Sequence, residues 1–235
     1  MSATNITLKN NEKRVLEYAE FSDVNLSLSE SSELILKLAN FAENSEIKIY
    51  GKIGKYARIS VVFADFSKGN TKIKSQIDLA EEGANCDWHL ATLSNKKDEK
   101  IFDISFKHLV GKTTSNMDNY GVARDESKIV FSGVSHITEG AKNSNAKQNA
   151  KIIVFDTNAQ GVASPILKID ENEVQASHGA IVGQLNSDHM FYLMSRGLTR
   201  EEARTIITLG YLKPVSSQFS EEIQSKIENA IKEAM

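Results

Sequence analysis

Residues 141–148 read AKNSNAKQ, and this mixture of small residues with Asn, Ser and Gln favours one of several β architectures. Small and amide side chains suit the corners of stacked parallel coils, where they form ladders and satisfy backbone groups. The repeat period along the chain is irregular, so periodicity alone does not identify a solenoid. The stretch favours a parallel β-helix, and the residues alone leave a β-sandwich and a β-barrel open.

Short apolar runs that are typical of β-strands lie on both sides of this stretch. Residues 59–63 form a mostly β-branched run, ISVVF, and residues 152–155 read IIVF. Polar clusters that are typical of turns separate the runs, as at residues 67–70 and 156–161. Many short strands with turn signals between them predict an all-β region that extends to about residue 183.

The pattern changes to helix after about residue 183. Asn186 or Ser187 can cap a short first helix, and Gly197 stands where a left-handed residue ends such a helix. Residues 199–202, TREE, form a capping box that predicts the start of a second helix. We expect Gly210 to end this helix and Pro214 to prevent its continuation.

A third helix is expected to start at Ser220. Its residues Ile223, Ile227 and Ile231 recur at every fourth position and form one apolar stripe. Short helices of this kind bury little apolar surface by themselves. They must therefore pack on the β region, on a partner, or on both.

Composition excludes several classes of protein. The chain has 235 residues with a net charge of −3 and well-mixed charges, which predicts no nucleic-acid-binding surface. We also expect no membrane span, because no apolar run approaches about 20 residues, and no signal peptide at the N-terminus. Cys86 is the single cysteine, so no intrachain disulfide is possible and a cytoplasmic location is expected.

Motifs for catalysis are weak, and we do not expect this chain to be an enzyme. Gly111-Lys112-Thr113 resembles part of a P-loop, but Phe106 stands where the preceding glycine is required. Cys86 and His89 have half of a metal-site spacing without a second half, and we interpret them as structural.

Four segments in the C-terminal part occur in one order and at close spacing: residues 139–148, 164–169, 174–185 and 190–203. Together they resemble the core of the SufB/SufD family of SUF iron–sulfur cluster assembly proteins. His178-Gly179-Ala180 is most similar to a short SufD, because SufB-like chains typically carry Glu in place of this glycine. Ala176 departs from the family, whose members often have a cysteine there. The long N-terminal helical region usual in the family is expected to be missing.

The resemblance implies a mainly β fold, a right-handed parallel β-helix followed by a small C-terminal helical subdomain. Residues 1–185 would form the β-helix core domain and residues 186–235 the helical subdomain that docks the SufC ATPase. The β-helix would face a SufB-like subunit. The function implied is that of a cytoplasmic scaffold subunit of the SUF complex, without a membrane or nucleic-acid partner.

The resemblance also implies the candidate sites. His178 is the candidate iron or cluster ligand at a subunit interface, where the partner can supply thiolates. We expect no cofactor to bind stably to the isolated chain and a transient iron–sulfur cluster to form in the complex. The residues expected to bind a partner belong to the first helix and the start of the second: Met190, Phe191, Tyr192, Arg196, Gly197, Arg200, Glu201 and Glu202.

Alternative interpretations remain open from the sequence. The chain can be a compact SufB/SufD homologue that acts as a homodimer, in which case the partner is a second copy. It can also be a purely structural partner of SufC that binds no metal. A third alternative is a carbohydrate-active β-helix protein, although the sequence offers no paired carboxylates for such chemistry.

Overall fold

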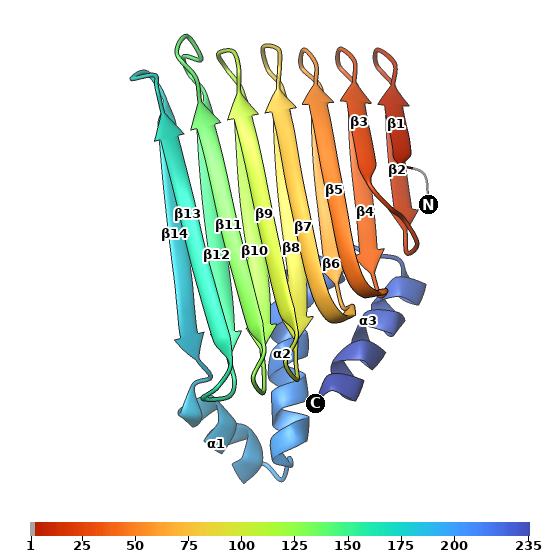
Figure 1. Ribbon diagram of the computed structural model, residues 1–235, viewed down its shortest axis with the longest axis vertical. Helices are drawn as coiled ribbons and strands as arrows, with labels where there is room; N and C mark the ends of the chain where they lie inside the picture. Colours follow the sequence, from red (N-terminus) through yellow and green to blue (C-terminus); the bar gives the residue numbers. More distant parts are fainter. Residues whose placement is uncertain (1–2) are drawn as a thin grey trace.

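The computed structural model describes residues 3–235. In this range, fourteen β-strands are followed by three α-helices, and the helices lie at one end of the strands (Figure 1). Sheet A contains, in spatial order, β1 (Thr4–Leu8), β3 (Val24–Leu28), β5 (Glu43–Ile53), β7 (Lys68–Leu79), β9 (Glu99–His108), β11 (Lys128–Ile137) and β13 (Gln160–Ile169). Sheet B contains, in the same direction, β2 (Lys13–Tyr18), β4 (Glu33–Asn40), β6 (Arg58–Asp65), β8 (Asn85–Ser94), β10 (Thr114–Ala123), β12 (Asn145–Val154) and β14 (Gln175–Gln184).

Successive strands alternate between the two sheets, so each pair of strands makes one coil. Within each sheet every neighbouring pair is parallel, from β1 with β3 to β12 with β14. Burial alternates along the strands; in β9, for example, every second residue is buried. The buried residues of both sheets face each other inside the coil. This arrangement confirms the predicted parallel β-helix followed by helices.

Residues in register form rows along the interior of the β-helix. One row runs from Leu16 of β2 through Leu36, Val61 and Trp88, the last three fully buried, and continues through Met117 to Gln148. The row therefore changes from large apolar side chains in the N-terminal coils to a polar side chain near the C-terminal end. Burial of the apolar members contributes about 1.5–3 kcal/mol for each side chain.

The stretch AKNSNAKQ, which favoured the β-helix, forms a turn and the first half of β12. Asn143 has a positive φ of 58°, and its N–H donates to Glu173 O of the next turn at 2.6 Å. Lys112 has φ 59° in the preceding turn, and its N–H donates to Lys142 O at 2.8 Å. Asparagine tolerates this left-handed conformation better than most residues. Stacked turns thus explain the amide-rich corner.

A buried ion pair ties together the coils of the N-terminal half. Lys100 Nζ lies 2.8 Å from Asp65 Oδ2, and both side chains have no exposed surface. Asn40 and Thr92 donate to the same carboxylate at 2.7 and 3.1 Å, and Ser67 O accepts from Lys100 Nζ at 2.9 Å. Each charge is therefore surrounded by hydrogen-bond partners, which buried charges require.

The helices are α1 (Ser187–Ser195), α2 (Arg200–Ser216) and α3 (Glu221–Ala234). Helices α2 and α3 pack on the outer face of sheet B and share one hydrophobic cluster with residues of β6, β8 and β10. The predicted stripe of Ile223, Ile227 and Ile231 is buried in this cluster. Among residues 3–235, no helix combines the length and the apolar character that crossing a membrane would take.

The prediction that Gly210 and Pro214 terminate the second helix is wrong. Helix α2 continues through both residues to Ser216. The reason is tertiary packing, because Leu212 and Val215, which follow Gly210, are fully buried against sheet B. Burying two such side chains contributes about 1.5–3 kcal/mol each, which offsets the cost of about 3 kcal/mol for a proline inside a helix.

Candidate functional site

The last coil, formed by β13 and β14, is a free end of the β-helix. Strand β14 pairs with β12 on one side, and within residues 3–235 no strand covers its other edge. All 10 residues of β14 are exposed, and its sequence contains no Asp, Glu, Lys or Arg. An uncovered edge presents unpaired N–H and C=O groups that are ready to pair with another chain. The end of the β-helix therefore has the properties of an interface.

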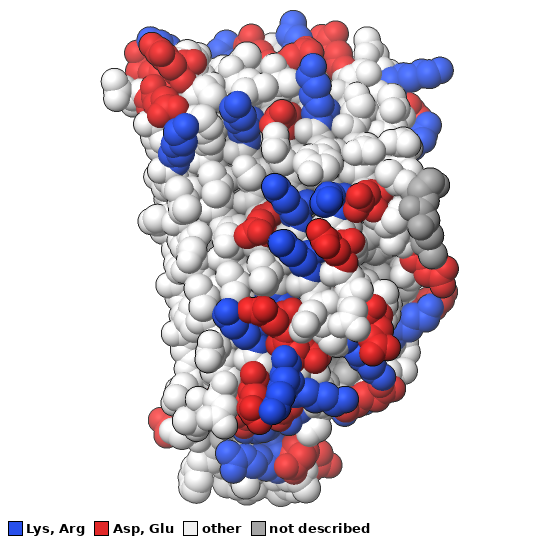
Figure 2. Space-filling view, in the orientation of Figure 1, with Lys and Arg blue, Asp and Glu red and all other residues white. Residues whose placement is uncertain are grey.

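Large apolar side chains surround this edge. The exposed fractions are 39% for Val162, 53% for Ile166, 63% for Ile181 and 44% for Val182. Charged side chains gather over the middle strands of sheet A, whereas the side of the molecule with β13 is largely uncharged between the turns (Figure 2). Val162 and Ile166 face outward from sheet A and Ile181 faces outward from sheet B, whereas Val182 belongs to the interior-facing row. Apolar side chains are therefore exposed on both outer faces and at the open end of the last coil. Exposed apolar surface is typical of a protein–protein contact.

His178 lies within this edge strand. It is in register with Gln148, whose side chain is buried inside the β-helix. Since residues in parallel register share a face, His178 belongs to the interior-facing row and is exposed because the β-helix ends at its strand. Residues 3–235 contain no group of three or more His, Cys, Asp or Glu side chains that can hold a metal ion. A metal ion at His178 would therefore need further ligands from outside residues 3–235.

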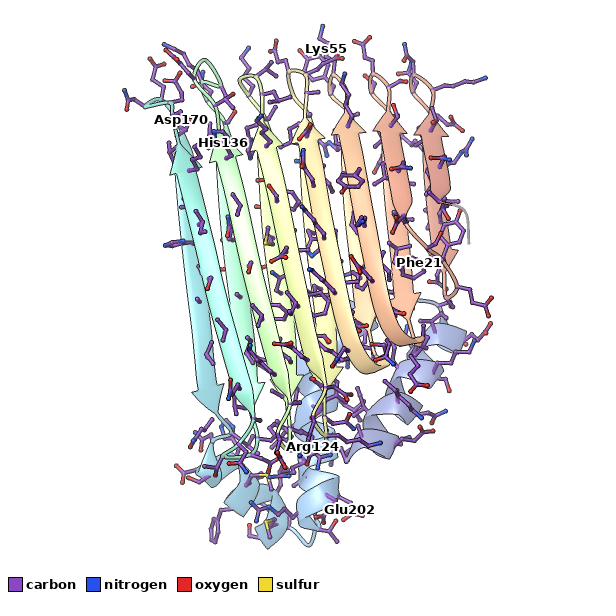
Figure 3. All side chains as sticks on the ribbon, in the orientation of Figure 1. Phe21, Lys55, Arg124, His136, Asp170 and Glu202 are labelled. Carbon is purple, nitrogen blue, oxygen red and sulfur yellow. The ribbon has the colours of Figure 1, made fainter. Side chains whose placement is uncertain are left out.

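Polar contacts in the turns fix the position of the last coil. His136 Nε2 and Asp170 Oδ2 are 2.7 Å apart at the end of β11 and β13, where Figure 3 shows the two side chains together. The hydrogen bond from His136 lowers the pKa of the Asp170 carboxyl below its usual range. Lys142 Nζ and Glu173 Oε1 are 2.7 Å apart across the same pair of turns. These two contacts join the turn before β14 to the preceding coil.

Helix α1 follows β14 after two residues and offers a second exposed surface. Its N-cap is Asn186, whose side chain accepts from Asp188 N at 2.7 Å, as predicted. The structure describes every residue of α1, and none of them is buried. Phe191 is 76% exposed, Tyr192 57% and Met194 46%.

The connection from α1 to α2 contains the predicted left-handed glycine and the predicted capping box. Gly197 has φ +95°, and Thr199 and Glu202 form both hydrogen bonds of the capping box. The bonds from the Thr199 amide and hydroxyl lower the pKa of the Glu202 carboxyl. Glu202, which was expected to bind a partner, is therefore already used as a helix cap, at the outer end of α2 (Figure 3). Arg196 stacks over the Tyr192 ring at 5.3 Å.

The structure separates the predicted site residues into two groups. His178 lies six residues before the end of β14, so roughly 20 Å of extended strand lie between it and Gln184, and α1 begins three residues further on. The other group comprises residues on α1 and the start of α2, all of them exposed except Met190, which is partly exposed: Met190, Phe191, Tyr192, Arg196, Gly197, Arg200, Glu201 and Glu202.

The remaining motifs have structural roles. Cys86 faces the interior of β8 and His89 faces outward, so the two side chains point away from each other. Burial raises the pKa of the Cys86 thiol well above its usual value. Lys112 Nζ pairs with Glu82 at 2.8 Å and Thr113 is buried against His108, so Gly111-Lys112-Thr113 is part of a coil turn.

Sequence reasoning missed the apolar side chains of the free edge, above all Ile166 and Ile181. The available signal was a ten-residue strand, Gln175–Gln184, without any charged residue. Exposed strands normally carry charges that prevent unwanted pairing. The absence of charge became informative only when the topology placed this strand at an edge.

Comparison with known proteins identifies the family. Residues 18–211 match the domain described as "SUF system FeS cluster assembly, SufBD core domain". This region runs from the end of β2 through α1 and most of α2. The chain belongs to the SufBD core family. The predicted relation to SufB and SufD is therefore confirmed.

Curated relatives of this SufBD chain carry matching names. The iron–sulfur cluster assembly protein SufD of Bacillus subtilis is 28% identical over 184 residues, which are 76% of this chain and 42% of that protein. An iron–sulfur cluster assembly SufBD family protein of Mycobacterium bovis is 29% identical over 124 residues, 53% of this chain and 15% of that protein. A SufBD family protein of Staphylococcus saprophyticus is 25% identical over 125 residues, 53% of this chain and 27% of that protein. The chain spans less than half the length of these relatives.

Proposed function

We propose that this SufBD chain is a non-enzymatic scaffold subunit of a cytoplasmic iron–sulfur cluster assembly complex. Its free β-helix end pairs with a SufB-like chain or with a second copy. Helix α1 and the start of α2 dock a SufC-type ATPase. ATP-driven movement of that partner, transmitted through the helices, opens the interface at the β-helix end and admits iron. Family membership and the two exposed surfaces support this proposal.

The observation that carries the proposal is the uncovered strand β14. The strand has free backbone groups along one edge and no charge to prevent pairing. Joining two such edges satisfies the unpaired N–H and C=O groups. It also covers apolar side chains on both faces of β14, Ile181 on the outer face and Val182 on the interior face. Burial of apolar surface at about 25 cal/mol per Å² favours the contact, and the backbone pairing gives it direction.

Helix α1 is the proposed docking element because it presents two aromatic side chains that are more than half exposed, Phe191 at 76% and Tyr192 at 57%. Phe191 and Tyr192 have the highest exposed fractions among its large apolar residues. Aromatic residues dominate the energy of many interfaces because they bury large areas with few rotatable bonds. A helix joined to β14 by two residues can transmit movement of a docked partner to the free edge.

His178 is the proposed contact to the cargo. An imidazole is a good iron ligand, and its place on the free edge brings it to the interface with the partner. Iron or a nascent cluster at this interface would take its remaining ligands from the partner. The cluster is therefore the transient cargo of the complex, not a resident cofactor of this chain.

Mass determination by multi-angle light scattering tests the two contacts. The chain is measured alone, with a SufB-like chain, and with a SufC-type ATPase from the same organism. Ile181→Lys places a charge in the middle of β14 and is expected to weaken pairing by about a hundredfold or more. Val15→Lys is the matched control, because Val15 on β2 at the opposite edge has the same exposed fraction, 63%.

The double substitution Phe191→Ala and Tyr192→Ala tests the helix in the same experiment. It is expected to remove the ATPase from the complex while pairing at β14 persists. Ile206→Ala on α2 is the control, with a side chain that is 47% exposed. A chain that stays monomeric with every partner, or equal effects of Ile181→Lys and Val15→Lys, would contradict the proposed scaffold.

A further inference from the structure

A small cavity lies inside the β-helix, one coil before the free end. Its volume is ≈ 10 Å³, about the space that one water molecule requires. The lining side chains come from both sheets and include Met117 and Asn119 of β10, Phe131 of β11 and Gln148 of β12. The cavity is separate from the edge of β14 and from helix α1.

Two buried amide oxygens beside this cavity lack hydrogen-bond partners among the described residues. They are Asn119 Oδ1 and Gln148 Oε1, on side chains that are 3% and 2% exposed. The orientation of the Gln148 amide is fixed, because its Nε2 donates to Ser135 Oγ at 2.7 Å and to Ile166 O at 3.1 Å. Leaving a buried acceptor unpaired is energetically unfavourable, so a hydrogen-bond donor next to each oxygen would stabilise the fold.

Gly133 of β11 accommodates the Gln148 amide. A Cβ atom at this position would lie 2.7 Å from Gln148 Oε1 and 3.0 Å from Met117 Sδ. Any larger residue at position 133 would therefore collide with the Gln148 amide and the Met117 thioether, so the glycine allows Gln148 to keep its place beside the cavity. Its neighbours in register, Ile104 and Pro165, have bulkier side chains.

We infer that Asn119, Gln148 and Gly133 form an internal hydration site for one water molecule. Water has two O–H groups, which match the two amide oxygens, and its own oxygen tolerates the weakly polar Met117 thioether. The site offers two oxygen ligands and no carboxylate, whereas hard metal cations take six or more oxygens. A small neutral hydrogen-bond donor is therefore the class of ligand that fits.

The proposed water would fix the orientation of the Gln148 side chain, the polar end of the interior row that starts on β2. Gln148 is in register with His178 on the next strand, so its amide forms the layer directly beneath the histidine. A water held between Gln148 and Asn119 would keep that amide from turning. The inference concerns the isolated chain and stands or falls independently of the proposed partners.

Magnetic relaxation dispersion of water oxygen-17 counts long-lived internal waters and tests the site in the full chain. Gly133→Ala pushes the Gln148 amide out of its place, because the added Cβ would lie 2.7 Å from Gln148 Oε1. The count is expected to fall by one relative to the unsubstituted chain. Gly51→Ala is the matched control: Gly51 faces the interior in the N-terminal half, and the atoms nearest to its Cβ would be those of the Ile77 and Leu26 side chains at 3.4–3.6 Å, an ordinary contact distance. This control is expected to keep the count unchanged.

Gln148→Met provides a second variant of similar volume that lacks the acceptor, and it too is expected to lose one long-lived water. Circular dichroism confirms that each variant is folded. A crystal structure is expected to show a single density peak at hydrogen-bond distance, about 2.8 Å, from both amide oxygens. An unchanged water count in both variants, a dry cavity, or a peak with metal coordination would overturn the inference.

Discussion

Within residues 3–235, sheet B has an uncovered strand at each end, β2 at one end and β14 at the other, and these two strands present different surfaces. At the N-terminal end, β2 carries Lys13, Arg14 and Glu17, and Lys13 pairs with Glu33 of the neighbouring strand at 2.8 Å. At the C-terminal end, all of β14 is exposed without one charged residue. Charges on an edge strand prevent pairing with other chains. In sheet B this difference favours pairing at β14 over pairing at β2. The contrast is confined to sheet B, because in sheet A the N-terminal edge strand β1 has no charged residue and β13 carries Lys168.

The interior differs in the same direction. From β4 to β8, the middle strand of sheet B, one interior row consists of large apolar side chains such as Leu36 and Trp88. The coils near β14 instead contain Gln148, Asn119 and Gly133 beside Phe131. In a β-helix each coil contacts mainly its neighbours, so local composition sets local stability. The N-terminal coils are therefore expected to be the stable body, and the last coil to depend on a partner for part of its stability.

The largest expected difference between the two ends is in the stability that each loses when one apolar side chain is truncated to alanine. Leu36→Ala removes a side chain with no exposed surface and should lower the free energy of unfolding by about 2–5 kcal/mol. Val182→Ala removes a side chain that is 44% exposed and should cost less than about 1 kcal/mol in the isolated chain. Urea denaturation followed by circular dichroism measures both values.

Repeating the two measurements in the assembled complex sharpens the test. Val182→Ala should become more costly there, because pairing buries the side chain, whereas the cost of Leu36→Ala should stay the same. Equal costs for the two truncations in the isolated chain would show that the ends do not differ in packing.

Lowering the pH is expected to reduce the free energy of unfolding by a somewhat smaller amount than Leu36→Ala does. The group responsible is His108, which lies in the polar interior of the middle coils. His108 is buried, and its ring nitrogens lie 2.7 Å from Thr113 Oγ1 and 2.8 Å from Ser115 Oγ. Burial, with a smaller contribution from the charge of His136, lowers the pKa of His108 from 6.5 to about 4. Between pH 6.5 and 4 the unfolded chain therefore binds a proton that the folded chain does not.

The stabilisation due to His108 is complete above pH 6.5 and is lost as the pH falls towards 4. The shift corresponds to roughly 3 kcal/mol. Unfolding free energies measured from pH 7 to 4 should fall more steeply for the unsubstituted chain than for His108→Gln, which cannot titrate. Parallel pH profiles for the two proteins would show that His108 carries no such linkage.

Local chemistry made much of this fold predictable from the sequence. Turn clusters and β-branched runs located the strands, and the capping box at Thr199 located α2. The stacking itself was hidden, because residues bonded across neighbouring coils of sheet B are 25, 27, 29, 31 and 30 residues apart. A drifting period gives no clear repeat signal, so the β-helix was predicted from the family resemblance.

Features that depend on tertiary contacts were not predictable. The passage of α2 through Pro214 depends on burial of Leu212 and Val215 against sheet B, which no local pattern shows. The orphaned oxygens of Asn119 and Gln148 appear only when two coils are stacked. Resemblance likewise named His178 but gave no information that its strand would be the uncovered edge.

The smallest effect on folding, and the most specific effect on function, is expected for His178→Ala. The side chain is exposed, so the free energy of unfolding should change by less than about 0.5 kcal/mol. In the assembled complex the same substitution should lower iron or cluster retention by about tenfold or more, because it removes a proposed ligand at the interface. Reconstitution followed by iron analysis and absorption spectroscopy measures this loss.

His89→Ala is the matched control for the ligand role. His89 faces outward from β8 and pairs with Asp118 at 3.8 Å, three strands away from the free edge. If the two ends differ as proposed, only the histidine on the uncovered edge should affect the cargo. Equal cluster retention in His178→Ala and the unsubstituted complex would leave β14 as a contact surface alone, and the chain would then act by pairing and docking without a metal ligand.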